Sequence, residues 1–393
     1  MTNHKSTRIE SIDILRGVVM VIMALDHVRA YFHYGSFFSN PTDLETTTPI
    51  LFFTRFITHY CAPVFIFLAG TSAFLYGSKK TRSQLFKFLI TRGVWLIILS
   101  VVINNFLWQF DITYSFIILQ VIWAIGLCMI LLSVIIFLPI KYILIIGAVL
   151  VAGHNTLDGI TMQGNSFKAI VWYILHQQQF IQIGNTLFAF FYPIIPWFGL
   201  ICLGYCFGIL YKKDFNKSIR KKYLLILGIG ATVAFFIIRG LNIYGDLVPW
   251  ETQDTMAKTI MSFFKVSKYP PSLCFLLITL GPALLFLYAI ESVKNKTTNF
   301  FLVFGRVPLF YYFSHIFLIH VLAIIGILIF GGNWQHMILN SDVFLNAKLI
   351  NYGYSLFVVY LVWIAIIILL YFPSKMYMKY KTQNKEKWWL SYL

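Results

Sequence analysis

The sequence predicts an all-α polytopic membrane protein with about ten transmembrane helices and both termini in the cytoplasm. Of its 393 residues, 59% are hydrophobic and only 11% are charged, whereas soluble domains carry about 25% charged residues. The apolar residues form continuous runs rather than alternating patterns, and a bilayer accepts such runs as helices that satisfy their own backbone hydrogen bonds. The chain is therefore expected to be one transmembrane domain, residues 1–393, and neither a soluble enzyme nor a disordered chain.

Ten apolar segments are long enough, or nearly long enough, to cross a bilayer. In chain order they lie at 12–33, 50–77, 86–108, 113–139, 141–154, 187–210, 222–241, 271–290, 307–330 and 353–372. The segment 141–154 is short, so it can equally be a re-entrant segment.

The basic residues predict the orientation of these segments. If the N-terminus is cytoplasmic, 21 of the 31 Lys and Arg residues lie on the inner side and five on the outer loops. The inner residues include Lys5 and Arg8, a loop at 211–222 and a tail at 374–393. This asymmetry is the positive-inside pattern of membrane proteins. The net charge of +17 therefore reports topology, and nucleic acid is not expected as a partner.

Two outer loops are long. Residues 155–186 contain FKAIVWYILHQQQF, which is expected to form an amphipathic helix at the membrane surface. Residues 242–270 are polar and carry Trp250 and Glu251, which are candidates for recognising a carbohydrate. Long loops often cover a functional site, although a solvated connection explains them equally well.

The segment 12–33 is unusually rich in ionisable residues for a membrane helix. Asp13, Arg16, Asp26 and His27 all lie in it, and such residues at membrane depth are costly unless they are paired or functional. Arg16 and His27 are eleven residues apart, so an α-helix returns them to within about 20° of the same face, with about 16.5 Å between them along the axis. The stripe passes through Met20 and Met23. Two residues so far apart are expected to hold different parts of one long ligand.

Other segments supply imidazoles and guanidinium groups at matching depths. Counting residues from the predicted ends of the helices places His59, His315 and His320 near the depth of His27. Three arginines lie near the predicted cytoplasmic ends of their helices: Arg16, Arg92 and Arg306. The pattern predicts an anion-binding inner mouth that leads to an interior lined by imidazoles.

Each of these residues also has a structural interpretation. Asp13 and Arg16, at i and i+3, can form an ion pair that anchors the end of the helix. A histidine in a membrane helix often makes only an interhelical hydrogen bond, and Arg306 can simply extend towards the membrane surface. No metal site is expected, on the interpretation that the histidines lack a companion carboxylate or thiolate at ligand spacing.

Five stretches resemble one family. They are RIESIDILRGVVMVIMALDH, THYCAPVFIFLAGTSAFL, YPIIPWFGLICLGYCFG, YPPSLCFLLITLGPALL and FGRVPLFYYFSHIFLIH. Their order is similar to that of bacterial membrane proteins related to heparan-α-glucosaminide N-acetyltransferase, from residue 8 to about residue 320. The spacing of Arg16 and His27 also resembles that of membrane acyltransferases that O-acetylate bacterial surface polysaccharides, in which this Arg and His are regarded as essential.

The resemblance implies an enzyme that takes an acetyl group from cytoplasmic acetyl-CoA and delivers it to a glycan on the far side of the membrane. It departs from the lysosomal N-acetyltransferase at one important place. In that enzyme, the residue at the position that matches His27 looks like an asparagine. Its proposed catalytic histidine corresponds to residues 46–49 of this chain, which contain no histidine. Heparan and glucosamine are therefore not carried over as substrates.

These observations lead to one hypothesis for the reaction. His27 is the general base, or a transient acyl carrier, and His59 orients it or holds the acceptor. Arg16, Arg92 and Arg306 are assigned to the phosphates of CoA, since a guanidinium group binds phosphate in a bidentate manner. The residues assigned to the acceptor are Asp26, His315, His320, Trp250 and Glu251.

Two other functions stay open at this stage. Buried His and Arg residues also line transport pathways for a sugar, an anion or a lipid-linked glycan, although no internal repeat supports a transporter. A non-catalytic binding protein, with histidines that only join helices, is the third. The expected location is the bacterial cytoplasmic (inner) membrane. The expected partners are the bilayer, acyl-CoA and a sugar or glycan acceptor, and a homo-oligomer is compatible with the sequence.

Overall fold

The computed structural model describes residues 9–384 and 386–391. Lys5 and Arg8, counted above as inner basic residues, lie outside the described residues, as does Lys385 of the tail. The α-helices are α1 (Glu10–Phe32), α2 (Pro49–Thr58), α3 (Cys61–Gly77), α4 (Arg82–Ile98), α5 (Asn105–Gln109), α6 (Val121–Ile135), α7 (Ile140–Gly153), α8 (Phe167–Leu175), α9 (Ile194–Phe207), α10 (Lys217–Leu241), α11 (Met256–Phe264), α12 (Leu273–Ile290), α13 (Lys296–Arg306), α14 (Pro308–Ile329), α15 (Ser341–Leu345) and α16 (Leu356–Gln383). The strands are β1 (Phe116–Leu119), β2 (Gln179–Ile183) and β3 (Thr186–Phe190).

The prediction of an all-α polytopic membrane protein is confirmed. In the described chain, eight helical stretches are long and apolar enough to cross a membrane: Pro49–Gly77, Arg82–Gln109, Ile140–Leu157, Ile194–Tyr211, Lys217–Leu241, Leu273–Ile290, Pro308–Ile329 and Leu356–Gln383. The other two predicted segments correspond to α1 and α6. Helix α1 has 23 residues but carries five charged ones, and α6 has only 15 residues. The short segment 141–154 lies within the candidate span Ile140–Leu157.

Two predicted segments begin as strands rather than as helices. β1 occupies the start of segment 113–139, and β3 occupies the start of segment 187–210. β3 lies in the middle of a three-stranded sheet, parallel to β1 and antiparallel to β2. An apolar run of four or five residues fits a strand as well as a helix, so periodicity could not separate them.

The segment 50–77 is also divided. α2 ends at Thr58 and α3 begins at Cys61, so His59 and Tyr60 form the joint between them. Segment 86–108 continues from α4 through a π-helical stretch, Leu99–Asn104, into α5. Within the long outer loops, α8 covers the first half of FKAIVWYILHQQQF and β2 follows it, while α11 lies in residues 242–270.

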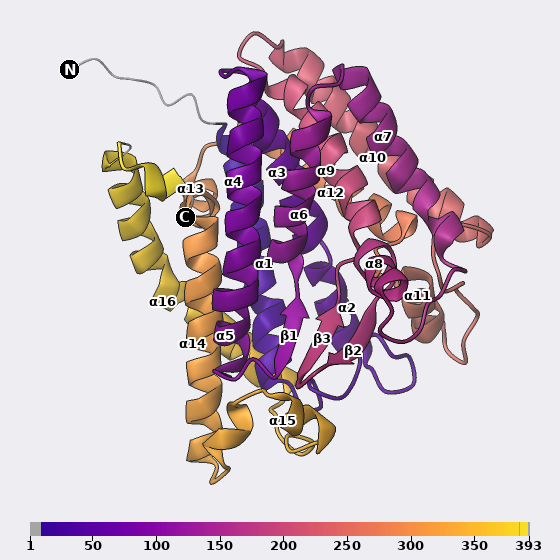
Figure 1. Cartoon of the computed structure of the whole chain (residues 1–393), viewed down its shortest axis with the longest axis vertical. Helices are drawn as coiled ribbons and strands as arrows, with labels where there is room; N and C mark the ends of the chain where they lie inside the picture. The colour runs from indigo at the N-terminus through magenta and orange to yellow at the C-terminus, as the bar shows by residue number, and fades with distance from the viewer. Residues whose placement is uncertain (1–8, 385, 392–393) are drawn as a thin grey trace.

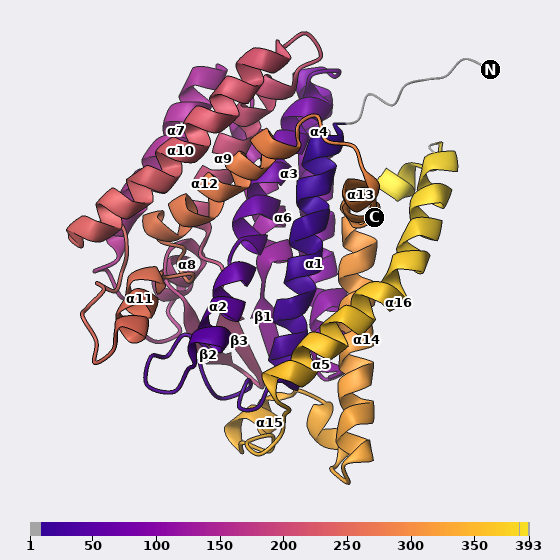
Figure 2. The same ribbon diagram turned by 180° about the vertical axis from the view of Figure 1, so that it is seen from behind.

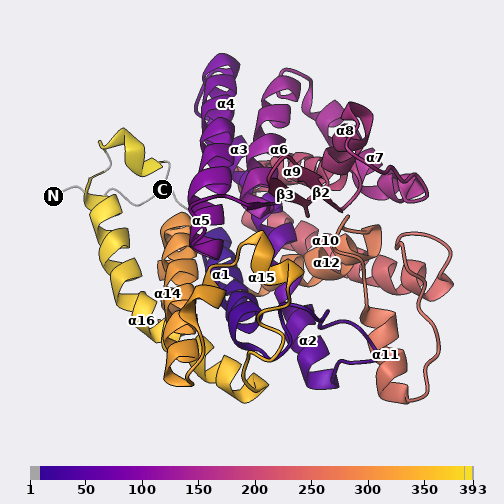
Figure 3. The same cartoon turned by 60° about the horizontal axis from the view of Figure 1, so that its bottom comes forward.

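The helices form two flanks around α1, α3 and α6 (Figures 1 and 2). α7 and α10 lie on one flank with α12, and α14 and α16 lie on the other. α16 contacts α1, α13 and α14. Seen from the end that carries α15, the short strands lie beneath the central helices and α11 lies at the periphery (Figure 3).

Glycines allow two of the central helix pairs to touch through their backbones. A Cβ atom on Gly17 of α1 would lie 1.9 Å from the Phe301 carbonyl oxygen of α13, and one on Gly305 would lie 1.8 Å from the Asp13 carbonyl oxygen. α3 and α9 meet in the same way, where a Cβ atom on Gly70 would lie 2.1 Å from the Ile201 oxygen. Small residues at helix contacts permit such close packing in membranes. The contact between α1 and α13 places Arg16 beside Gly305.

Candidate active site

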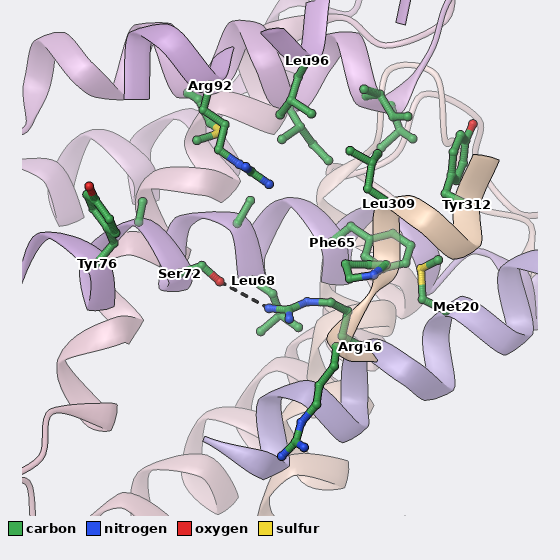
Figure 4. Close-up of a pocket in the computed structure, with 18 of the residues that line it drawn as sticks. Arg16, Met20, Phe65, Leu68, Ser72, Tyr76, Arg92, Leu96, Leu309 and Tyr312 are labelled. Carbon is green, nitrogen blue, oxygen red and sulfur yellow. Dashed lines mark hydrogen bonds between the residues drawn. The ribbon is translucent and has the colours of Figure 1, made fainter. Parts of the chain in front are cut away.

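A cavity of about 450 Å³ opens between α1, α3, α4, α6 and α14. Figure 4 shows the guanidinium groups of Arg16 and Arg92 pointing into it from opposite sides. Tyr76 and Tyr312 lie at opposite ends of the cavity in this view. The wall between them is mostly apolar and includes Leu68. The cavity therefore suits a ligand that joins an anionic part to a long, weakly polar arm.

Four cationic residues line the cavity: Arg16, Arg92, Arg306 and Lys381. None of the described lining residues is acidic. The three arginines expected at the inner mouth thus come together in one place. Lys381, from the far end of α16, was counted in the sequence only as part of the basic tail. Its distance of 365 residues from Arg16 leaves no sequence signal for this role.

Contacts from three helices hold Arg16 in position. Its Nη1 donates to Asp13 Oδ1 at 2.9 Å and to the Gly305 carbonyl oxygen at 3.2 Å. Its Nη2 donates to Ser72 Oγ at 3.3 Å. Arg306 Nε lies 3.8 Å from Asp13 Oδ2. The ion pair between Asp13 and Arg16 is therefore part of the cavity wall, which makes its structural and ligand-binding interpretations compatible.

The stripe on α1 leads from the cavity to His27. Arg16, Met20 and Met23 line the cavity on successive turns, and His27 follows one turn beyond Met23. His27 is not among the lining residues. Tyr312 is the connection, because it lines the cavity and its ring centroid lies 5.9 Å from that of His27.

His27 contacts a second imidazole, that of His315 on α14. The Nδ1 atom of His27 lies 2.7 Å from Nε2 of His315, and the two rings are stacked with an interplanar angle of 7°. On its other side, Nδ1 of His315 lies 2.8 Å from the Tyr311 carbonyl oxygen. The sequence pattern predicts that His315 holds the acceptor and that His59 serves His27, whereas in the structure it is His315 that contacts His27.

The carbonyl oxygen of Tyr311 selects the tautomers of both rings. A carbonyl oxygen can only accept, so Nδ1 of His315 carries the hydrogen and, in a neutral ring, Nε2 is an acceptor. Nδ1 of His27 must then donate to it. This leaves the lone pair of His27 on Nε2, which makes no hydrogen bond to any residue in the described part of the chain. His27 therefore presents a free basic nitrogen.

Aromatic rings enclose this pair. The Trp108 ring lies 4.9 Å from the His27 ring, edge to face. Trp108 Nε1 donates to the Tyr312 hydroxyl at 3.3 Å, which holds both side chains against the imidazoles. Sequence reasoning did not find Trp108 or Tyr312. Tyr312 lies three residues before His315, a helical spacing that offered a signal, whereas Trp108 offered none.

The other two predicted histidines lie elsewhere. His59 is buried at the joint between α2 and α3, where its ring lies 5.2 Å from Phe275 and 6.0 Å from Phe56. No contact joins it to His27 among the contacts of the described residues. His320 is buried with its ring nitrogens 3.1 Å from the Leu107 oxygen and 2.7 Å from the Met337 oxygen. These contacts give His320 a role in joining α14 to two neighbouring segments.

Asp26 binds one arginine of its own helix and one of α2. One of its carboxylate oxygens accepts from Arg29 at 3.1 Å, and the other accepts from Arg55. Both oxygens are thus engaged by guanidinium groups.

Trp250 and Glu251 do not line the cavity. The Trp250 indole donates to the Arg239 carbonyl oxygen at 2.9 Å, and the Glu251 amide donates to Ser262 Oγ at 3.0 Å. These contacts fold residues 242–270 onto the end of α10.

Comparison with known families now complements this geometry. A family model described as heparan-alpha-glucosaminide N-acetyltransferase, catalytic, matches residues 8–244. The match covers more than half of the chain and includes Arg16, His27, His59 and Arg92. No curated protein matches the chain.

Proposed function

The chain belongs to the heparan-alpha-glucosaminide N-acetyltransferase catalytic family, and from this premise we propose that it moves an acetyl group from acetyl-CoA to a sugar or glycan acceptor. An acetyltransferase of the membrane is what the family and the spanning helices indicate in general terms. The proposal adds the donor, the acceptor class, the base and the location in the bacterial cytoplasmic membrane. The family match favours this activity over transport.

The cavity supports acetyl-CoA as the donor. CoA carries several phosphates on its nucleotide and ends in a long pantetheine arm with a thioester. The phosphates would be bound by the four cationic side chains at the cavity, Arg16, Arg92, Arg306 and Lys381. Hydrogen bonds between a cationic side chain and a phosphate are stronger than those between neutral groups. The apolar wall would receive the arm. Tyr312 lies where the cavity approaches His27, so the thioester is expected beside it.

The observation that carries the proposal is the free Nε2 atom of His27. In the reaction, a hydroxyl or amine of the acceptor attacks the thioester carbonyl carbon while Nε2 removes its proton. The carbon–sulfur bond breaks, and the CoA thiolate takes up the proton from the resulting imidazolium. The products are an acetyl ester or amide and CoA. His315 holds the His27 ring in the required tautomer through the 2.7 Å contact.

Two sides of the membrane are used in this proposal. The positive-inside pattern puts the cationic mouth on the cytoplasmic side, where acetyl-CoA is made. His27 lies further along α1, towards the outer side, so the acceptor would approach it from there. Within the described residues, the hydrogen bonds and ring contacts of His27 involve Trp108, Tyr312 and His315 and do not include His59, Asp26 or Trp250. The expected part of these three residues in holding the acceptor stays a prediction.

The test is thioester turnover by the purified protein in detergent with a panel of sugars and glycans. Release of the CoA thiol and formation of acetylated product are both measured. Because a general base contributes about 10²- to 10⁴-fold, His27→Ala is expected to lower kcat by that factor while acetyl-CoA still binds.

A matched control is His336→Ala, which removes an imidazole from the short 3-10 helix Trp334–Met337. His336 is not among the described residues that line the cavity. Full activity of His27→Ala would refute the assigned base. Sugar uptake by proteoliposomes that lack acyl-CoA, without any acetyl transfer, would refute the enzyme and favour transport.

A further inference from the structure

A second group of ionisable residues lies outside the cavity, in the 155–186 loop and at the end of α7. His154 follows the last residue of α7, and Asp158 lies four residues later. His176 follows the last residue of α8. One nitrogen of each imidazole and one carboxylate oxygen of Asp158 all lie within 4.8 Å of one another. None of the three belongs to the proposed acetyl-transfer site.

The hydrogen bonding of this cluster is incomplete. His154 is 2% exposed, yet neither of its ring nitrogens has a hydrogen-bond partner among residues 9–384 and 386–391. His176 is 3% exposed, and its Nδ1 likewise has no partner within these described ranges. Its Nε2 lies 3.0 Å from Asp158 Oδ1. A buried polar atom without a partner costs roughly 1–3 kcal/mol, and a bound cation would supply the missing partner.

We propose that His154, Asp158 and His176 bind a divalent transition-metal ion, Zn²⁺ by preference. Two imidazoles and one carboxylate are a ligand set that suits Zn²⁺, with water as a fourth ligand. Ligand atoms lie about 2.0–2.1 Å from a tetrahedral zinc ion, and hence about 3.3 Å from each other. The His176 and Asp158 atoms are already 3.0 Å apart. Since all the ligand atoms lie within 4.8 Å of one another, no pair needs to close by more than about 1.5 Å to reach this geometry.

The surroundings of Asp158 are consistent with such a site. Asn155 Nδ2 donates to Asp158 Oδ2 at 2.8 Å, which leaves Oδ1 directed towards His176. The Asn155 side-chain oxygen in turn accepts from the Leu273 amide at 3.0 Å. A metal ion here would therefore tie the ends of α7 and α8 to the start of α12. Such a tether would stabilise the outer loop without taking part in acetyl transfer.

The prediction from the sequence is that there is no metal site, although His154 and Asp158 are four residues apart. The third ligand is absent from this local pattern, because His176 follows α8 and lies near His154 and Asp158 only in the folded chain.

The test uses the full-length protein, stripped with a chelator and dialysed against Zn²⁺ alone. We expect about one zinc ion per chain by elemental analysis, a Zn²⁺-dependent rise in Tm, and a visible absorption band of tetrahedral Co²⁺ when Co²⁺ replaces Zn²⁺. Asp158→Asn keeps the size of the side chain and its contact with Asn155, and is expected to lose the bound zinc and the rise in Tm. His336→Ala is the matched control and is expected to retain both.

The proposal is overturned if the wild-type protein binds no zinc above the level of a metal-free blank, or if Asp158→Asn binds as much as the wild type. Because the wild-type titration stands alone, a variant that fails to fold does not rescue the proposal. Zinc binding and acetyl transfer are measured separately, and the proposed tether takes no part in the reaction. Loss of one readout without the other therefore shows which of the two proposals fails.

Discussion

Replacing His315 by alanine tests whether the imidazole pair works as proposed. The side chain touches His27 but does not line the cavity. His315→Ala would leave Nδ1–H of His27 without its acceptor, so the ring could rotate or place its hydrogen on Nε2. We therefore expect kcat to fall while KM for acetyl-CoA changes little.

The size of the loss follows from the contact. During the reaction His27 becomes positively charged, and a hydrogen bond to a charged group contributes about 1.5–3 kcal/mol. A factor of ten in rate corresponds to about 1.36 kcal/mol, so kcat is expected to fall roughly 10- to 150-fold. His315→Gln is expected to retain more activity, because the oxygen of its side chain can replace Nε2 as the acceptor.

The assay is CoA release with the best acceptor from the panel, with melting curves recorded to confirm folding. In the double variant His27→Ala and His315→Ala, the loss should equal that of His27→Ala alone, because His315 acts only through His27. A His315→Ala variant with wild-type kcat, or losses that simply multiply in the double variant, would refute this reasoning.

Three further predictions concern the donor site, the charges around Asp26 and the turn that precedes β1. Arg92→Ala should raise KM for acetyl-CoA about tenfold or more with little change in kcat. Arg92→Lys should recover part of the affinity, because it keeps the positive charge. An unchanged KM in Arg92→Ala would exclude a contact between Arg92 and a phosphate. Asp26→Ala should lower the free energy of unfolding by about 3 kcal/mol, because it leaves the buried Arg29 and the partly buried Arg55 without their carboxylate. A denaturant titration that shows no loss would contradict this. For Asp111, burial alone would raise the pKa, but hydrogen bonds from Thr113 and Ser115 lower it overall. The stability that it contributes is therefore present above the ordinary pKa of Asp and lost as the pH falls through the lowered value, and Asp111→Asn should flatten this acid-side slope in thermal unfolding measured against pH.

The candidate site shows how far local pattern extends. The face shared by Arg16, Met20, Met23 and His27 follows from the 3.6-residue period of one helix, and three of these residues do line one cavity. Counting residues from the helix ends also predicts that Arg16, Arg92 and Arg306 lie at one inner mouth, and all three line the cavity. The predicted depths do not show which histidine contacts His27, because residues at the same depth can lie on helices that do not pack together.

Packing made that choice. His315 lies 288 residues from His27 and meets it because α14 packs against α1. His59 lies at a joint between two helices. Pro63, four residues later, has no backbone N–H to donate to the His59 carbonyl oxygen, which accounts for the break there. Lys381 and Trp108 enter the site in the same way, from segments that the sequence separates widely from α1.

The membrane class, the approximate positions of the spanning helices and the polar stripe along α1 can all be predicted from the amino-acid sequence. These depend on composition, length and helical period, which are local properties of the chain. Three features depend on tertiary packing instead. They are the contact of His27 with His315, the tautomer selected by the Tyr311 carbonyl oxygen, and the cluster of His154, Asp158 and His176. Each of these depends on which surfaces pack together, and close contacts between distant helices, such as Gly17 against Gly305, decide that packing.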